Sequence, residues 1–155
     1  NYKNVSFELL TRDDRENLMQ KIDPENKWQK RIHIESVLFK DMPMKLSNHD
    51  GSVFFFNSNI SKLGSAPTRM AEILGTGIPV LTNTGVGDVD RIILENKIGE
   101  LLNSENKIDI KMACDNFMQL VIKKDIAKHC RSVAEELFSL EVGVKNYRFI
   151  YNKII

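Results

Sequence analysis

Several features are scarce in this chain of 155 residues, and each scarcity excludes a class of chemistry. Its two cysteines, Cys114 and Cys130, lie far apart and form no CxxC pair, so we expect reduced thiols rather than a zinc site or a disulfide. The histidines, His33, His49 and His129, show no metal-ligand spacing. No apolar run approaches the ~18 residues that a membrane-spanning helix needs. The sequence also shows no signal peptide.

The charge balance is close to neutral. The chain carries 22 basic and 21 acidic residues and a formal net charge of +1, which argues against bulk electrostatic binding to nucleic acid. A hydrophobic content of 42% over this length can fill one core, and no linker, repeat or low-complexity segment divides the chain. We therefore expect a single domain over residues 1–155. Because the first residue is Asn rather than Met, we expect the chain to belong to a longer protein.

Strand and helix patterns alternate along the chain. Strands are predicted at residues 5–10, 32–36, 53–56, 78–81 and 98–102, and helices at 14–22, 38–48, 88–94, 108–123, 125–138 and 141–154. The runs at 53–56 and 78–81 are apolar on both faces, which is typical of parallel strands covered by helices on both sides. Asp13 and Asp88 are expected to cap the helices that follow them. This order predicts a Rossmann-like α/β fold, a parallel sheet flanked by helices with a helical C-terminus.

The most informative stretch covers residues 65–87 and reads SAPTRMAEILGTGIPVLTNTGVG. Pro67 suits the first position of a helix, where its missing N–H costs nothing. The backbone N–H groups of Thr68, Arg69 and Met70 then lack partners within the helix. Together with the positive end of the helix dipole and the charge of Arg69, they predict a phosphate-binding site.

Two further features lie in the same stretch. Glu72 shares a helix face with Thr68 and Arg69, because these residues are three and four positions apart. Gly85 and Gly87 separate a strand from a helix, where glycine permits positive φ and close approach of the backbone to a ligand.

This stretch resembles the sugar-nucleotide half of the retaining GT-B glycosyltransferases, especially the large group-1 (family 4-like) proteins. The resemblance continues through residues 92–102, a helix followed by a glycine and a short strand, and from Phe138 into the C-terminal helix. The elements that carry it are Pro67, Glu72, Gly77, Pro79, Val80, Gly85 and Gly87.

The resemblance implies the C-terminal, donor-binding half of a two-domain enzyme that holds a nucleotide-diphosphate sugar. Glu72 would bind the ribose hydroxyls, and Arg69 would stabilise charge on the leaving diphosphate without a metal ion or a further cofactor. These two are the residues for which it implies a catalytic role. The nucleotide-binding set that it implies is Ser65, Pro67, Thr68, Arg69, Met70, Glu72, Gly85, Gly87 and, near the base, Val37.

The chain also departs from the family. Gly64 stands where a second glutamate often contacts the donor sugar, and we expect the chain to begin after the family's first strand and its basic loop. Three alternatives therefore stay open: a non-catalytic nucleotide-sugar-binding module, another enzyme of GT-B architecture such as a nucleotide-sugar epimerase, and an unrelated α/β nucleotide-binding domain. Asp88-Val89-Asp90 matches the Asp-x-Asp motif of metal-dependent GT-A enzymes, but we interpret it as a chance match beside a glycine loop.

The partners are also implied by the resemblance. They are a missing N-terminal acceptor-binding domain and a glycan or lipid-linked acceptor, in polysaccharide or glycoconjugate biosynthesis at a bacterial cell envelope. The isolated chain would be inactive. The expected location is cytoplasmic, with peripheral contact at the inner membrane face as an option. The last helix, with Tyr147, Arg148, Phe149 and Tyr151, is expected to pack on the missing domain or, less favourably, to approach the membrane.

Overall fold

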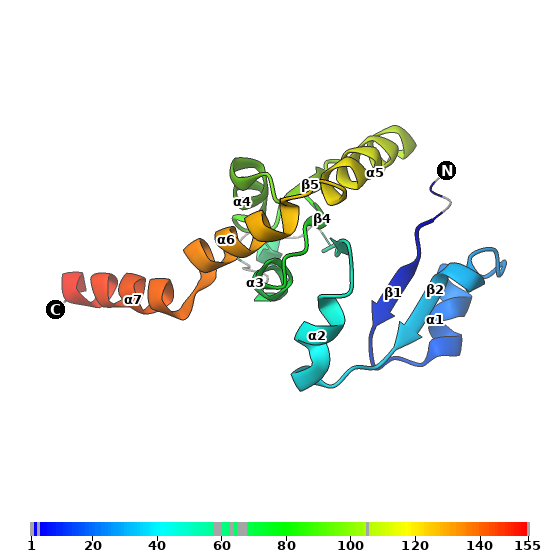
Figure 1. Ribbon diagram of the computed structural model, residues 1–155, viewed down its shortest axis with the longest axis horizontal. Helices are drawn as coiled ribbons and strands as arrows, with labels where there is room; N and C mark the ends of the chain where they lie inside the picture. The colour runs from blue at the N-terminus through cyan, green and yellow to red at the C-terminus, as the bar shows by residue number, and fades with distance from the viewer. Residues whose placement is uncertain are drawn as a thin grey trace. The chain divides into compact units, whose positions relative to one another are not determined.

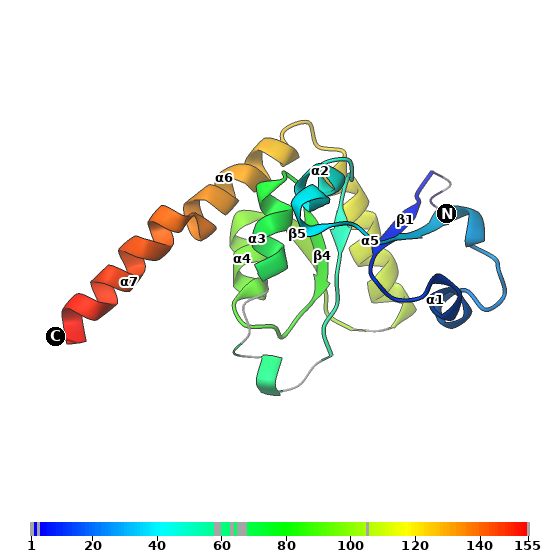
Figure 2. The same ribbon diagram turned by 90° about the horizontal axis from the view of Figure 1, so that it is seen from below.

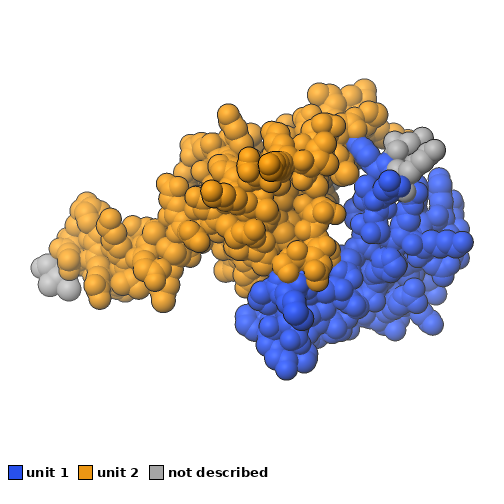
Figure 3. Space-filling model, in the orientation of Figure 1, with its two compact units in different colours: residues 1–45 blue, residues 46–155 orange. Residues whose placement is uncertain are grey.

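The computed structural model describes residues 2, 4–57, 60–62, 64, 68–104 and 106–154. They form an α/β structure in which short parallel strands are flanked by helices and three helices follow at the C-terminus (Figure 1). The coarse fold prediction is therefore confirmed. The chain divides into two compact units, Asn1–Lys45 and Leu46–Ile155, which are coloured separately in Figure 3 and described one at a time below.

The first unit contains a β–α–β element. β1 (Phe7–Leu10) and β2 (Ile32–Glu35) pair in parallel, with α1 (Arg15–Ile22) between them in the sequence. The carboxylate of Asp14 accepts a hydrogen bond from the Asn17 N–H at 2.9 Å, so Asp14 is the N-cap. The predicted cap, Asp13, is wrong by one residue, because its carboxylate accepts from the Thr11 hydroxyl at 2.9 Å.

A buried carboxylate fixes the turn after α1. Asp23 is almost fully buried, and its two oxygens accept hydrogen bonds from the N–H groups of Lys27 at 2.9 Å and Trp28 at 2.7 Å. The short helices η1 (Gln29–Arg31) and η2 (Phe39–Asp41) follow, and α2 (Met42–Leu46) leads into the second unit. The buried acid therefore has a structural role.

The second unit is built on a three-stranded parallel sheet in the order β3-β4-β5. The strands are β3 (Ser52–Val53), β4 (Val80–Asn83) and β5 (Gly99–Leu102). Helices cover it on both sides, as Figure 2 shows, with α3 (Thr68–Gly75) and α4 (Val89–Asn96) on one side and α5 (Lys107–Val121) on the other. α6 (Ile126–Phe138) packs against α3 in the same core. The main core comprises Met70, Ile73, Leu74, Ile78, Val80, Val86, Val89, Ile92, Ile93, Ile98, Cys130, Val133 and Ala134.

The strand predicted at 53–56 differs from the observed edge strand. Phe54 still donates its N–H to the Leu81 carbonyl at 3.1 Å, but β3 itself ends at Val53. Phe54 and Phe56 pack against the core, whereas Val53 and Phe55 are 42% and 54% exposed. Val53 and Phe55 are two residues apart and share one face of the run. The expectation that both faces of this run are covered is therefore wrong in the described structure, where β3 is an edge strand.

The helices of the last third agree with the sequence pattern. α5 is capped by Asn106, whose side-chain oxygen accepts hydrogen bonds from the N–H groups of Ile108 at 3.0 Å and Asp109 at 2.9 Å. α6 ends at Phe138, and α7 (Leu140–Ile154) begins after Ser139. Figures 1 and 2 both show α7 reaching away from the sheet, and none of its described residues is buried.

The two cysteines are free, as expected, and differ in environment. Cys130 is fully buried on α6, where burial raises the pKa of its thiol to about 11, and Cys114 is half-buried on α5 with a pKa raised by burial and by Asp115. Because only the thiolate reacts, we expect iodoacetamide at neutral pH to modify Cys114 first and Cys130 only after unfolding. Peptide mass spectrometry over time measures both rates. Equal rates in the folded chain would contradict the prediction.

Thr82 presents a buried hydroxyl at the centre of the sheet. It is fully buried in β4, and its Oγ1 has no hydrogen-bond partner among the described residues. An unpaired buried hydroxyl is costly, and an apolar group of the same shape removes the cost. We expect Thr82→Val to raise the free energy of unfolding by about 1 kcal/mol, measured by urea denaturation. The matched control Thr82→Ser keeps the hydroxyl and should lower it, and destabilisation by valine would show that the hydroxyl has a partner.

Candidate functional site

The carboxyl edge of the β3-β4-β5 sheet brings two loops into contact. The loop after β4 reaches the short helix η3 (Ile60–Lys62), because the N–H of Gly87 donates to the Lys62 carbonyl at 3.0 Å. The side chain of Asn83, the last residue of β4, accepts from the Phe56 N–H at 2.8 Å and donates to the Phe56 carbonyl at 2.9 Å. These contacts join the segment after β3 to the loop after β4, at the edge where open parallel sheets bind ligands.

The glycine loop has the backbone geometry that its sequence predicts. Gly85 and Gly87 have φ angles of 86° and 49°. A Cβ added to Gly85 would meet nothing within 4 Å, so its backbone faces open space. The Gly85 N–H, however, donates to both carboxylate oxygens of Asp90 at 3.2 Å. Asp90 therefore occupies this donor and helps to hold the loop.

The helix start that was predicted to bind phosphate is described from Thr68 onward. Thr68 and Arg69 are exposed, whereas Met70 is 1% exposed and belongs to the core. The first N–H groups of an α-helix have no partner within it, which applies to the first turn of α3. Met70 can thus offer its backbone only. Ser65 and Pro67, also predicted at this site, lie outside the described residues.

Glu72 lies one turn further along α3 and is exposed, so its carboxylate is accessible to a ligand. It lines a groove of about 320 Å³ between α3 and α6, together with Arg131 and Glu135 of α6. Arg131 is itself anchored by a hydrogen bond from Nη1 to the Thr76 carbonyl at 2.8 Å. The sequence prediction missed this groove, since nothing in the local pattern indicates which helix packs beside α3.

Val37 follows β2 and is half-buried in the first unit. The other described candidates belong to the second unit: Thr68, Arg69, Met70, Glu72, Gly85 and Gly87. The structure describes the two units separately, so a role for Val37 near a nucleotide base stays a prediction.

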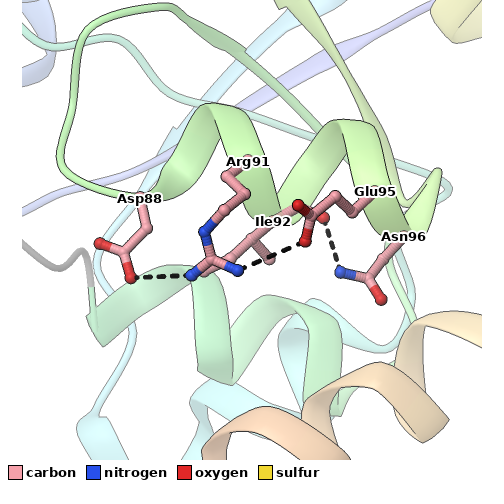
Figure 4. Close-up of polar contacts among 5 residues, drawn as sticks. All are labelled: Asp88, Arg91, Ile92, Glu95 and Asn96. Atoms are coloured by element: carbon pink, nitrogen blue, oxygen red, sulfur yellow. Dashed lines mark hydrogen bonds and ion pairs between the residues drawn. The ribbon is translucent and has the colours of Figure 1, made fainter.

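The expected cap of α4 is corrected by its side-chain contacts (Figure 4). Asp88 occupies the N-cap position, but its side chain makes no capping hydrogen bond. Its carboxylate instead contacts the Arg91 guanidinium at 3.3 Å, and Arg91 reaches Glu95 at the same distance. Asp88 has φ −94° and ψ 11°, whereas an N-cap residue usually has an extended backbone, and its carboxylate pairs at i,i+3 instead. The Asp88 side chain therefore forms an ion pair on the surface of α4 and does not cap its N-terminus.

The Asp88-Val89-Asp90 motif does not converge on one point. The Asp88 carboxylate accepts a hydrogen bond from Arg91, whereas the Asp90 carboxylate accepts one from the Gly85 N–H. Val89, which lies between them in the sequence, has a buried side chain. Among the residues that the structure describes, no three His, Cys, Asp or Glu side chains gather as a metal-ligand set. The Asp90 carboxylate therefore binds the glycine loop, and the Asp88 carboxylate binds Arg91 on α4.

Lys62 is a cation at this edge that the sequence analysis did not single out. Its Nζ lies 5.5 Å from the centre of the Phe56 ring, and its carbonyl anchors Gly87. It lies before α3 in the sequence, in a segment with no periodic pattern, which explains why it was missed. Arg69, exposed in the first turn of α3, is a second cation of this unit.

A second hollow, of about 350 Å³, lies in the first unit and is lined by α1 and the turn that follows it. Both oxygens of the buried Asp23 in its wall are already bonded to backbone N–H groups. The buried acid in the wall of this hollow therefore holds the turn after α1.

No protein family model matches the chain, and no curated protein matches it. Within the described residues, every helix is too short or too polar to cross a membrane.

Proposed function

We propose that this chain is the nucleotide-sugar-binding half of a GT-B glycosyltransferase. In the complete enzyme it would help to transfer a sugar from a nucleotide-diphosphate sugar to an acceptor, with retention of configuration. The observation that carries the proposal is the contact of the glycine loop after β4 with η3, through the Gly87 N–H and the Lys62 carbonyl. It lies at the carboxyl edge of a parallel sheet, the usual ligand-binding edge in such folds.

The chemistry of this edge suits a diphosphate. The first turn of α3 presents backbone N–H groups, and Arg69 adds a permanent charge with a planar donor fork. These donors would stabilise the charge that builds on the leaving diphosphate, a role that needs no metal. Glu72, one turn away and exposed, would accept hydrogen bonds from the ribose hydroxyls.

The wider context is part of the same proposal. A second domain would hold a glycan or lipid-linked acceptor, because GT-B transfer takes place between two domains, and the isolated chain would bind donor without transferring it. Such a reaction belongs to polysaccharide or glycoconjugate biosynthesis, and we place it in the cytoplasm, with peripheral contact at the inner membrane face where the acceptor is lipid-linked.

One observation favours a second candidate, a nucleotide-sugar-binding module without transfer activity. Gly64 is exposed, and an added Cβ would meet nothing within 4 Å, so the position has room for the glutamate that the family often carries. Lack of space therefore does not explain the missing carboxylate. Donor hydrolysis or transfer by the longer protein distinguishes the two candidates, since a binding module gives neither product.

Calorimetric titration with UDP, GDP and uridine tests the proposed binding site. We expect diphosphate-dependent binding, and we expect Arg69→Ala to weaken it about tenfold, because a hydrogen bond to a charged group contributes about 1.5 kcal/mol or more. Arg15→Ala, which removes an exposed arginine of α1, is the matched control and should leave the affinity unchanged. Equal affinity for uridine and UDP, or no diphosphate binding by the longer protein, would overturn the proposal.

A further inference from the structure

The C-terminal helix α7 carries an apolar stripe that the described residues leave uncovered. Leu140, Val144, Tyr147, Tyr151 and Ile154 follow one another at alternating spacings of four and three residues, and they are 78, 40, 66, 60 and 75% exposed. This is the spacing of the a and d positions of a coiled coil, which place their side chains along one seam. Isolated helices of this length are marginal in water, so the stripe indicates a helical partner.

The preceding helix shows how such a stripe packs in this chain. Ile126, Cys130, Val133 and Leu137 of α6 precede Leu140 with the same alternating spacing. Cys130 and Val133 are buried in the core that α6 shares with α3, and Ile126 packs against that core. The apolar periodicity therefore continues into α7, but no helix of the described structure packs against the apolar stripe there.

The charges beside the stripe are self-complementary. Glu141 and Arg148 each follow a stripe residue directly, so they occupy the same flank. If a second α7 lies antiparallel, with Val144 of one copy opposite the partner's Tyr147, Glu141 comes beside the partner's Arg148. The two-fold axis repeats this pair on the other side. A parallel pair would instead leave Glu141 about 10 Å along the axis from the partner's Arg148.

The opposite flank fits the same alignment. It places Ile150, which is 52% exposed, against the partner's Gly143. A Cβ added to Gly143 would meet nothing within 4 Å, so the helix surface is open at that point. A large side chain thus meets a glycine on one flank while opposite charges meet on the other.

We propose that two copies of this chain associate through α7 as an antiparallel, two-fold symmetric helix pair. The interface consists of the apolar stripe, two Glu141–Arg148 pairs and two Ile150–Gly143 contacts. A second copy gives Glu141 an opposite charge at the edge of the stripe, which an anionic lipid face does not supply. The pair replaces the packing on a missing domain that the resemblance implies for this helix, and it does not involve the proposed sugar-nucleotide site, which lies on other elements.

Sedimentation equilibrium of the whole chain over a range of concentrations tests the association. We expect a dimer that Glu141→Arg weakens about tenfold, because two attractive pairs become repulsive. Combining Glu141→Arg with Arg148→Glu should restore the wild-type affinity. Lys153→Glu reverses an exposed charge that is neither three nor four residues from Glu141 or Arg148, and should change nothing. A chain that stays monomeric at about 1 mM, or a double reversal that fails to restore association, would overturn the proposal.

A spin label measures the orientation. In a Cys114→Ser background, Lys153→Cys supplies an exposed thiol while Cys130 stays buried. The antiparallel alignment places the two labelled backbone positions about 22 Å apart along the helix axes, and a parallel pair places them about 10 Å apart. The shorter distance would contradict the proposed interface. Monomeric chains that bind vesicles of anionic phospholipid would likewise overturn it and assign α7 to a lipid surface.

Discussion

Gly99→Ala is expected to destabilise strongly the unit that contains the β3-β4-β5 sheet. Gly99 pairs with Val80 in the register of β4 and β5. A Cβ at this position would lie well inside contact distance of the Val80 carbonyl oxygen and 2.8 Å from the Val80 Cγ2. The carbonyl belongs to the most buried strand of the fold, so the backbone would have to move. We expect the free energy of unfolding to fall by about 3 kcal/mol or more.

Gly75→Ala provides the matched control for that experiment. Gly75 is the exposed last residue of α3, and an added Cβ would meet nothing within 4 Å. Alanine there should leave stability unchanged or raise it by about 0.5–1 kcal/mol, because glycine loses more backbone entropy in a helix. Urea unfolding followed by circular dichroism compares both variants with the wild type. Equal stability of Gly99→Ala and Gly75→Ala would show that β4 and β5 are not packed as closely as described.

The β4 strand shows what apolar periodicity can and cannot predict. The sequence places a strand at 78–81, whereas pairing runs over Val80–Asn83. Ile78 and Pro79 are buried but precede the strand, just after the Gly77 turn with its φ of 88°. Thr82 and Asn83 are polar yet belong to the ladder. The buried residues and the strand-paired residues therefore overlap but are not the same set. The apolar pattern of the sequence indicates only which residues are buried.

The end of β3 depends on a contact that local sequence does not encode. The apolar run continues to Phe56, but the Asn83 amide, 27 residues away in the sequence, takes both backbone groups of Phe56. The Asn83 side chain therefore takes the place of the backbone hydrogen bonds that would extend the pairing of β3 with β4. A prediction from the run alone could not anticipate that its partner would be a side chain rather than a strand.

The candidate site divides in the same way. The positive φ angles at Gly85 and Gly87 and the exposure of Arg69 follow from residue type and spacing. The distribution of roles between Asp88 and Asp90 does not, because both carboxylates lie close to the loop in sequence and only the path of the backbone separates them. The groove beside Glu72 likewise depends on α6, which the sequence places more than fifty residues later.

Glu72→Ala is the substitution with the largest expected effect on binding. A carboxylate that accepts hydrogen bonds from ribose hydroxyls contributes about 1.5–3 kcal/mol, so donor affinity should fall about tenfold to hundredfold. Because Glu72 is exposed, the free energy of unfolding should stay within about 0.5 kcal/mol of the wild type. Glu135→Ala removes a second carboxylate from the same groove and should leave donor affinity unchanged. Calorimetric titration with UDP compares the three proteins.

A ligand that lacks the hydroxyls separates a ribose contact from a general electrostatic effect. With 2′,3′-dideoxy-UDP, the wild type should lose about as much affinity as Glu72→Ala loses with UDP, and the variant should lose little more. If the carboxylate acted only through its charge, its removal would reduce repulsion of the diphosphate and affinity would rise for both ligands. A rise, or an unchanged affinity for UDP, would remove Glu72 from the proposed site. The remaining candidates at the carboxyl edge would then be Arg69, the first turn of α3 and the glycine loop.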